Sequence, residues 1–136
     1  MEQESLHYIA DIPQKAIIEY DGKVLIVQNE KGVWELPGGR LHKDEKPRDG
    51  LIREIQEELA LRVKPKEIFD VGVFTGGETR QQHFVVVYCC ELLDPLGAMV
   101  IDETEIKAIH WITKQELDTV SIRPMYQEML RRYFVD

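Results

Sequence analysis

The sequence predicts a mixed α/β (α+β) domain that combines several β-strands with two amphipathic helices. Three observations lead to this prediction. β-rich runs fill the first quarter and the middle of the chain, apolar residues recur every four positions around residues 48–59, and a second amphipathic segment closes the chain. With 136 residues, 43% of them hydrophobic, the chain is long enough to bury a core, so we expect one domain over residues 1–136.

The first half of the chain is expected to form a β-hairpin and a short third strand. Residues 16–20 and 23–29 are β-rich, and Asp21-Gly22 between them is typical of a two-residue hairpin turn. Residues 33–36 predict a short strand. We interpret Pro37-Gly38-Gly39 after it as a break that opens a polar loop.

A first helix is expected from Arg48 to Leu59. Pro47 suits its first turn, because the fixed φ of proline fits that position and an N–H there would have no helical partner. Leu51, Ile55 and Leu59 recur every four residues and form an apolar stripe. We therefore expect this helix to lie on a core.

The second half of the chain predicts three more strands and two helical segments. Residues 69–74 and 83–93 are β-rich, and the continuous apolar run in the second predicts a central strand covered on both faces. Thr113 is a plausible cap for a short helix. The remaining elements are a strand at residues 106–112 and a closing helix at residues 124–133.

The charge balance argues against nucleic acid polymers and anionic membranes as partners. The chain has 17 basic and 25 acidic side chains, a net charge of -8, whereas both of these partners require a basic surface. A polyphosphate substrate would then need cations to accompany it.

A cytoplasmic location is expected from the cysteines and the N-terminal residues. Cys89 and Cys90 are adjacent, a spacing that suits neither a conventional disulfide nor a zinc site, and a reducing compartment fits this pattern. The N-terminal segment has two early glutamates and no apolar core of a signal peptide, and no stretch has the length of a membrane span. Secretion and membrane insertion are therefore not expected.

Glu54, Glu57 and Glu58 form an acidic cluster on one side of the first helix. They stand at positions i, i+3 and i+4, so they project from the same face within one turn. Glu58 lies only about 20° from the apolar stripe, so its carboxylate is expected against the domain body. With Arg53 as the obvious basic neighbour, the cluster predicts a site for a hard divalent cation. The alternative is a solvated acidic helix face.

The glycine turn and the helix together resemble the Nudix box. Gly39, five residues, Glu45, seven residues and then Arg53 to Leu61 follow the pattern glycine-x5-glutamate-x7-Arg-Glu-aliphatic-x-Glu-Glu-x-Gly-aliphatic. One fixed position departs, since Ala60 stands where the pattern has glycine; a left-handed helix end would strain it by on the order of 1 kcal/mol. The resemblance to the Nudix hydrolase (MutT-like) family implies a Nudix fold, an α/β/α sandwich with a mixed β-sheet and a catalytic loop-helix-loop.

The same resemblance implies a metal site on this loop-helix-loop. Glu54, Glu57 and Glu58 match the metal-binding positions of the family, and the carbonyl of Gly38 matches a backbone ligand. The expected cofactor is Mg²⁺ or Mn²⁺, and the number of ions stays open. The supporting positions of the motif are matched by Gly39 and Glu45.

The resemblance also implies which residues take part in the reaction. Arg53 matches the residue that orients the glutamates, and Glu54 matches the residue that accepts a proton from the attacking water in some members. In other members the base comes from a later loop, where Glu103 and Glu105 are the candidates. We favour Glu105, because Glu105-Ile106 before Trp111 looks like the family's Glu-aliphatic-x4-Trp segment.

Weaker signals lie in the loops and the aromatic residues. Arg80 stands between two predicted strands, where it is a candidate for contact with a phosphate or a base, and a solvated charge is the alternative. Trp34 and Trp111 are expected in the core more than against a base. His83 and His110 are expected to be packed histidines and not ligands.

These features predict a metal-dependent pyrophosphohydrolase. Its substrate would be a nucleoside diphosphate linked to another group X, cleaved to a nucleoside monophosphate and phosphate-X, with cleaning of the nucleotide pool as one role. Hydrolysis of ADP-ribose or another nucleotide sugar is the alternative within this class, and a non-catalytic nucleotide-sensing regulator is the alternative of another class. The expected partner is a nucleotide or nucleotide derivative, and the chain is either a monomer or a homodimer.

Overall fold

The computed structural model describes residues 10–76 and 81–135 of the chain. Its two α-helices are α1 (Pro47–Leu59) and α2 (Pro124–Tyr133), and short 3-10 helices occupy Leu96–Ala98 and Lys114–Glu116. The strands are β1 (Pro13–Tyr20), β2 (Lys23–Gln28), β3 (Trp34–Glu35), β4 (Gly38–Arg40), β5 (Val63–Gly76), β6 (Gln81–Leu92) and β7 (Ala108–Ile112).

The strands form one mixed sheet centred on β1. Its main order is β3-β2-β1-β6-β5, while β4 pairs with β1 and β7 pairs with β2. β1 runs parallel to β6 and antiparallel to β2 and β4. The predicted mixed sheet is therefore confirmed.

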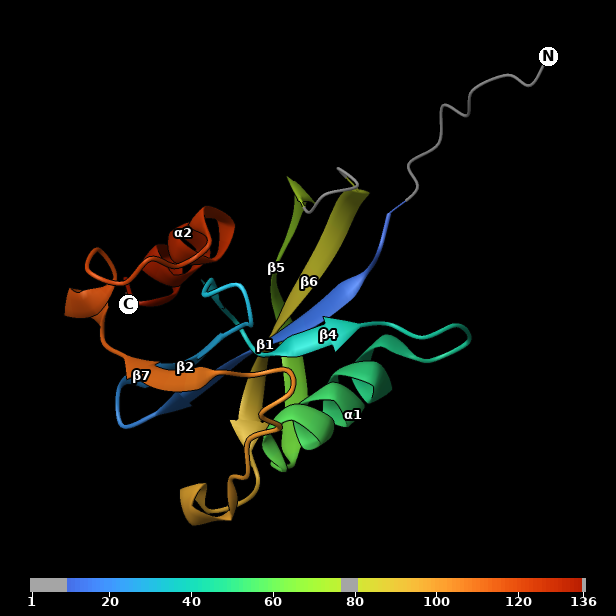
Figure 1. The fold of residues 1–136 in the computed structure, drawn as a ribbon, viewed down its shortest axis with the longest axis horizontal. Helices are drawn as coiled ribbons and strands as arrows, with labels where there is room; N and C mark the ends of the chain where they lie inside the picture. The colour runs from blue at the N-terminus through green and yellow to red at the C-terminus, as the bar shows by residue number, and fades with distance from the viewer. Residues whose placement is uncertain (1–9, 77–80, 136) are drawn as a thin grey trace.

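The two helices cover opposite faces of the sheet (Figure 1). Side chains alternate along β1, so Ile18 packs in the cluster that contains Leu51 and Leu59 of α1, whereas Ile17 packs with Met129 of α2. β6 contributes to both clusters, as expected for an inner strand. The α/β/α layering is confirmed.

Local sequence signals account for most of the elements. Asp21 and Gly22 both have positive φ, 53° and 75°, which is the backbone of the hairpin turn that they predict. α1 begins at Pro47, and Ala60 ends it in the left-handed conformation, at φ 55° and ψ 33°. α2 has the predicted bounds.

Several boundaries differ from the prediction, among them the start of β1, which lies at Pro13 and not at residue 16. The interpretation of Pro37-Gly38-Gly39 as a break is wrong for its last two residues, because they pair with β1 as part of β4. β5 begins at Val63 and not at residue 69; it lies at the edge of the sheet, where a bulge accommodates its proline. β7 begins at Ala108, because Lys107 and the residues before it belong to a loop.

No α-helix within residues 10–76 and 81–135 is long and apolar enough to cross a membrane.

Arg80, the predicted substrate contact, lies outside the described residues.

Candidate active site

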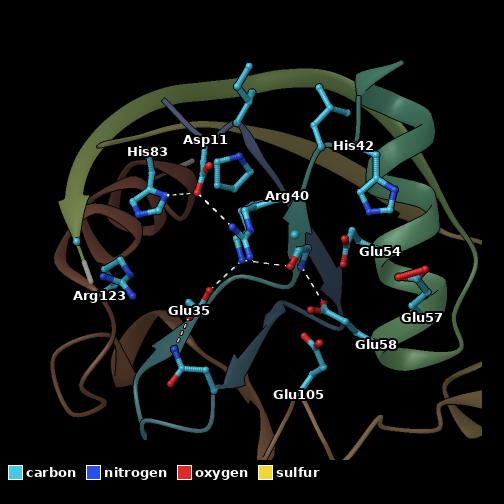
Figure 2. Close-up of a pocket in the computed structure, with 18 of the residues that line it drawn as sticks. Asp11, Glu35, Arg40, His42, Glu54, Glu57, Glu58, His83, Glu105 and Arg123 are labelled. Carbon is cyan, nitrogen blue, oxygen red and sulfur yellow. Dashed lines mark hydrogen bonds and ion pairs between the residues drawn. The ribbon is translucent and has the colours of Figure 1, made fainter. Parts of the chain in front are cut away.

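A cavity of about 1500 Å³ opens where β1 and β6 begin and β5 ends (Figure 2). One side of it is lined by acidic residues of α1 and by the glycines of β4. The other side is lined by residues from the ends of β1, β3, β5 and β6 and by the start of α2. The two helices that cover opposite faces of the sheet thus both contribute to this cavity.

The two glycines of β4 bring the sheet and α1 into close contact. Gly38 has a φ of 134°, and a Cβ there would collide with the backbone carbonyl of Gln14 on β1. A Cβ on Gly39 would occupy the space of the Glu54 carboxylate. Glycine at both positions therefore lets α1 lie against the strand and holds Glu54 at the floor of the cavity.

Arg53 connects three carboxylates on the rim of the cavity. Its Nε and Nη2 donate to the two oxygens of Glu45, at 2.7 and 3.1 Å, and its Nη1 donates to Glu54 and to Glu57, each at 3.0 Å. The hydrogen bonds from Arg53 lower the pKa of Glu45 to about 2. Arg53 thus contacts two glutamates of the acidic cluster, and Glu45 holds Arg53 through two hydrogen bonds.

Glu58 is the buried member of the acidic cluster. Only 8% of the residue is exposed, and its Oε1 accepts a hydrogen bond from the N–H of Gly38 at 3.1 Å. Burial is the main cause that raises the pKa of Glu58 to about 7, with Glu54 and Glu105 as further causes, against the opposing effect of Lys15. Its negative charge is therefore incompletely compensated by the protein.

Lys15 places a buried ammonium group next to this cluster. Its Nζ donates to Glu35 at 2.9 Å and to the carbonyl of Gly38 at 3.2 Å. Burial opposes the charge, but Tyr126, Glu35 and Glu58 together hold the pKa of Lys15 above its ordinary value. The Gly38 carbonyl, which the sequence predicts as a metal ligand, thus already accepts a hydrogen bond from the ammonium group of Lys15.

Of the two loop glutamates, only Glu105 reaches the cavity. The N–H of Asp102 donates to the carbonyl of Glu58 at 2.9 Å, which ties this loop to the end of α1. Glu105 lines the cavity and lies beside Glu58 in Figure 2. Glu103 is exposed and is not among the lining residues, and its carbonyl accepts from Lys107.

The end of the cavity away from the acidic helix combines rings and charges. The rings of Phe74 and His83 stack with centroids 4.7 Å apart, and the guanidinium of Arg123 lies 4.7 Å from the Phe74 centroid. His83 also pairs with Asp11, at 3.4 Å. His83 is packed, as predicted, but it faces the cavity. Trp34 and Trp111 pack against the core.

Sequence reasoning did not find Lys15, Glu35 or Arg123. These residues come from distant positions and meet only because β1, β3 and the start of α2 are neighbours in the fold. One signal was available, since Lys15 is a lone charge at the start of a buried apolar run. A buried lysine needs a carboxylate partner, which indicates a polar site.

The donor set fits a hard divalent cation. Within the described parts of the chain no three acidic, histidine or cysteine side chains converge closely enough to hold an ion, because Glu54 and Glu57 turn toward Arg53. The side chain of Glu57 is 57% exposed, however, so it has room to turn from Arg53 toward the cavity, while Glu58 carries a buried charge that lacks full compensation. Oxygen ligands of this kind suit Mg²⁺ and related ions.

Comparison with known proteins identifies relatives of the whole domain. The family profile described as NUDIX domain matches residues 15–133. A MutT-like protein of Streptomyces ambofaciens is 33% identical over 102 residues, which cover 74% of this chain and 62% of that protein; the chain thus spans less than two thirds of that relative. A CTP pyrophosphohydrolase of Escherichia coli (strain K12) is 29% identical over 106 residues, which cover 74% of each chain.

Solved structures share the arrangement of strands and helices. The crystal structure of a MutT protein from Methanosarcina mazei Go1 matches with a TM-score of 0.80, covers 95% of this chain and 96% of that chain, and is 20% identical. At this identity the likeness concerns the fold alone.

Proposed function

Because this chain belongs to the NUDIX domain family, a family of hydrolases that act on nucleotides and generally use divalent metal cations, we propose that it is a metal-dependent pyrophosphohydrolase. Its substrate is a nucleoside diphosphate linked to another group X, which it cleaves to a nucleoside monophosphate and phosphate-X. Mg²⁺ or Mn²⁺ serves as the cation, and removal of unwanted nucleotides is one role for such an activity.

One observation carries the proposal: a buried carboxylate with an unusually high pKa sits among other carboxylates at the floor of a large cavity. Glu58 is flanked by Glu54 and Glu105, which raise its pKa further after burial has raised it. A purely structural helix face would not collect uncompensated charge at such a place. The arrangement becomes favourable once a cation and the phosphates of a substrate occupy the cavity.

The residues of the cavity have distinct roles in the proposed reaction. Glu54, Glu57 and Glu58 hold the cation together with the Gly38 carbonyl, and Arg53 orients the first two. A bound divalent cation neutralises phosphate charge and stabilises the charge that develops on the leaving group. Glu105 is the proposed acceptor of the proton from the attacking water, since it is exposed to the cavity and close to the cluster.

The test compares two glutamates of similar surroundings. Glu57 is 57% exposed and pairs with Arg53 one turn away, while Glu128 on α2 is 61% exposed and pairs with Arg132 one turn away. Glu57→Gln is expected to lower Mg²⁺-dependent turnover of a nucleotide panel by at least about 100-fold. Glu128→Gln, outside the cavity, is expected to change turnover by less than about twofold.

Circular dichroism and thermal melting check that both variants fold. Both glutamates are surface residues, so neither substitution is expected to unfold the protein. Normal turnover in Glu57→Gln would contradict the proposed metal site. A panel that includes nucleoside triphosphates and ADP-ribose separates the two substrate classes. Binding of nucleotides without turnover by the unaltered protein would instead favour a sensor.

Two further expectations remain proposals. Cys89 and Cys90 are free thiols, and this supports a reducing, cytoplasmic compartment. Residues 1–136 act as one catalytic domain, either as a monomer or as a homodimer.

A further inference from the structure

Arg123 is the cation at the end of the cavity opposite the acidic helix (Figure 2). Its backbone N–H donates to the carbonyl of Trp34 at 2.9 Å, which fixes the residue at the start of α2. Its guanidinium lies over the ring of Phe74, 4.7 Å from the centroid. The planar group is therefore held in one orientation at the cavity wall.

The guanidinium of Arg123 makes no hydrogen bond or ion pair with any side chain or carbonyl in residues 10–76 and 81–135, and its Nε is buried without a partner. The nearby carboxylate of Glu35 attracts Arg123 electrostatically but accepts no hydrogen bond from it, since one oxygen accepts from Lys15 and the other from Asn29. Leaving donors of a charged group without acceptors is costly. Burial closes the Nε side of the group, so a ligand in the cavity meets the N–H groups of Nη1 and Nη2.

The position of Arg123 indicates which part of a nucleotide it meets. In the proposed function the phosphates lie at the Glu54, Glu57 and Glu58 end, where the cation is held. A cavity of about 1500 Å³ is larger than the roughly 300–1000 Å³ of common ligand pockets, so a whole nucleotide fits. With the phosphates at one end, the base reaches the end that holds Phe74 and Arg123.

We propose that Arg123 reads the base and makes this enzyme prefer cytosine and guanine nucleotides. A guanidinium presents two parallel N–H donors, which match two adjacent acceptors on a base. Guanine offers O6 and N7, and cytosine offers O2 and N3. Adenine and uracil have no such pair, because N1 and N7 of adenine flank the N6 amino donor and the two carbonyls of uracil flank the N3–H donor. This inference rests on the proposed function, and it adds the class of base.

The test replaces the guanidinium of Arg123, with its two parallel donors, by an ammonium group that keeps the positive charge. Arg123→Lys retains a cation, so a contact with phosphate would survive, whereas paired hydrogen bonds to a base would not. Arg131→Lys is the matched control, since Arg131 lies on α2, which directly follows Arg123, but pairs with Asp118 outside the cavity. Two quantities are measured: kcat/KM for CTP, GTP, ATP and UTP with Mg²⁺, and calorimetric binding of the four monophosphates, which needs no turnover.

The unaltered protein is expected to prefer CTP and GTP over ATP and UTP, and CMP and GMP over AMP and UMP. In Arg123→Lys, kcat/KM for CTP and GTP falls about 5- to 150-fold, mainly through KM, and the values for ATP and UTP stay within about twofold. The control keeps the preference of the unaltered protein.

Two results would overturn the inference. The first is the same outcome for all four bases in Arg123→Lys, since equal losses indicate a structural role and no loss for any base indicates a contact with phosphate. The second is no base preference in the unaltered protein. A different result would refute the proposed function. Binding that prefers CMP and GMP, without turnover of any triphosphate or of ADP-ribose, supports the base site and refutes the hydrolase.

Discussion

Glu58→Gln is expected to stabilise the metal-free protein at alkaline pH. Glutamine keeps the size of the side chain and an oxygen that accepts from the N–H of Gly38 at the place of the present 3.1 Å hydrogen bond. It removes a negative charge that burial makes unfavourable. The substitution therefore separates the charge of Glu58 from its packing.

The magnitude follows from the pKa of Glu58, which is 4.5 for a free side chain and about 7 in the folded protein. The folded protein binds this proton more tightly than the unfolded chain, so the contribution of Glu58 to stability falls as pH rises from about 4.5 to 7 and stays low above that. The difference corresponds to about 3 kcal/mol at pH 8. Below pH 4.5 both states are protonated and the effect vanishes.

The assay is urea unfolding in the presence of EDTA at pH 8 and at pH 5. We expect Glu58→Gln to be more stable than the unaltered protein by about 3 kcal/mol at pH 8, with a much smaller difference at pH 5. Addition of Mg²⁺ at pH 8 then stabilises only the unaltered protein, since the variant lacks the charged ligand. A variant that is less stable at pH 8, or a difference that is equal at both pH values, would refute the reasoning.

Two other substitutions test the helix end and the loop. Ala60→Gly is expected to raise the free energy of unfolding by about 1 kcal/mol, because glycine adopts the observed φ of 55° without strain; urea unfolding measures it, and a loss of stability would contradict the strain. Glu105→Gln is expected to lower kcat by about 100-fold or more with little change in Mg²⁺ affinity, whereas its neighbour Glu103→Gln stays within about twofold. Equal kcat values in these two variants would exclude Glu105 as the base.

Sequence patterns predict those parts of the fold that local chemistry determines. The Asp21-Gly22 turn and the bounds of α2 are correct, because backbone preference and apolar spacing act within a few residues. β4 escapes prediction, because Gly38 and Gly39 have no strand preference of their own. Pairing with β1, far away in sequence, makes them a strand.

The same distinction applies to the site. The acidic cluster is visible in the sequence, because its members lie within one helical turn. Burial of Glu58 also follows from helical arithmetic, and the structure leaves it 8% exposed. The opposite wall with Lys15 and Arg123 depends on strand order, which no local pattern specifies.

Lys15 provides a permanent positive charge beside the acidic cluster of the cavity. Its ammonium is anchored on the central strand, where it touches the Gly38 carbonyl and lowers the proton affinity of Glu58. In the proposed reaction dications enter with the substrate and leave with the product, whereas the charge of Lys15 belongs to the protein. On that proposal, Lys15 keeps part of the acidic charge of Glu58 balanced when no dication is bound.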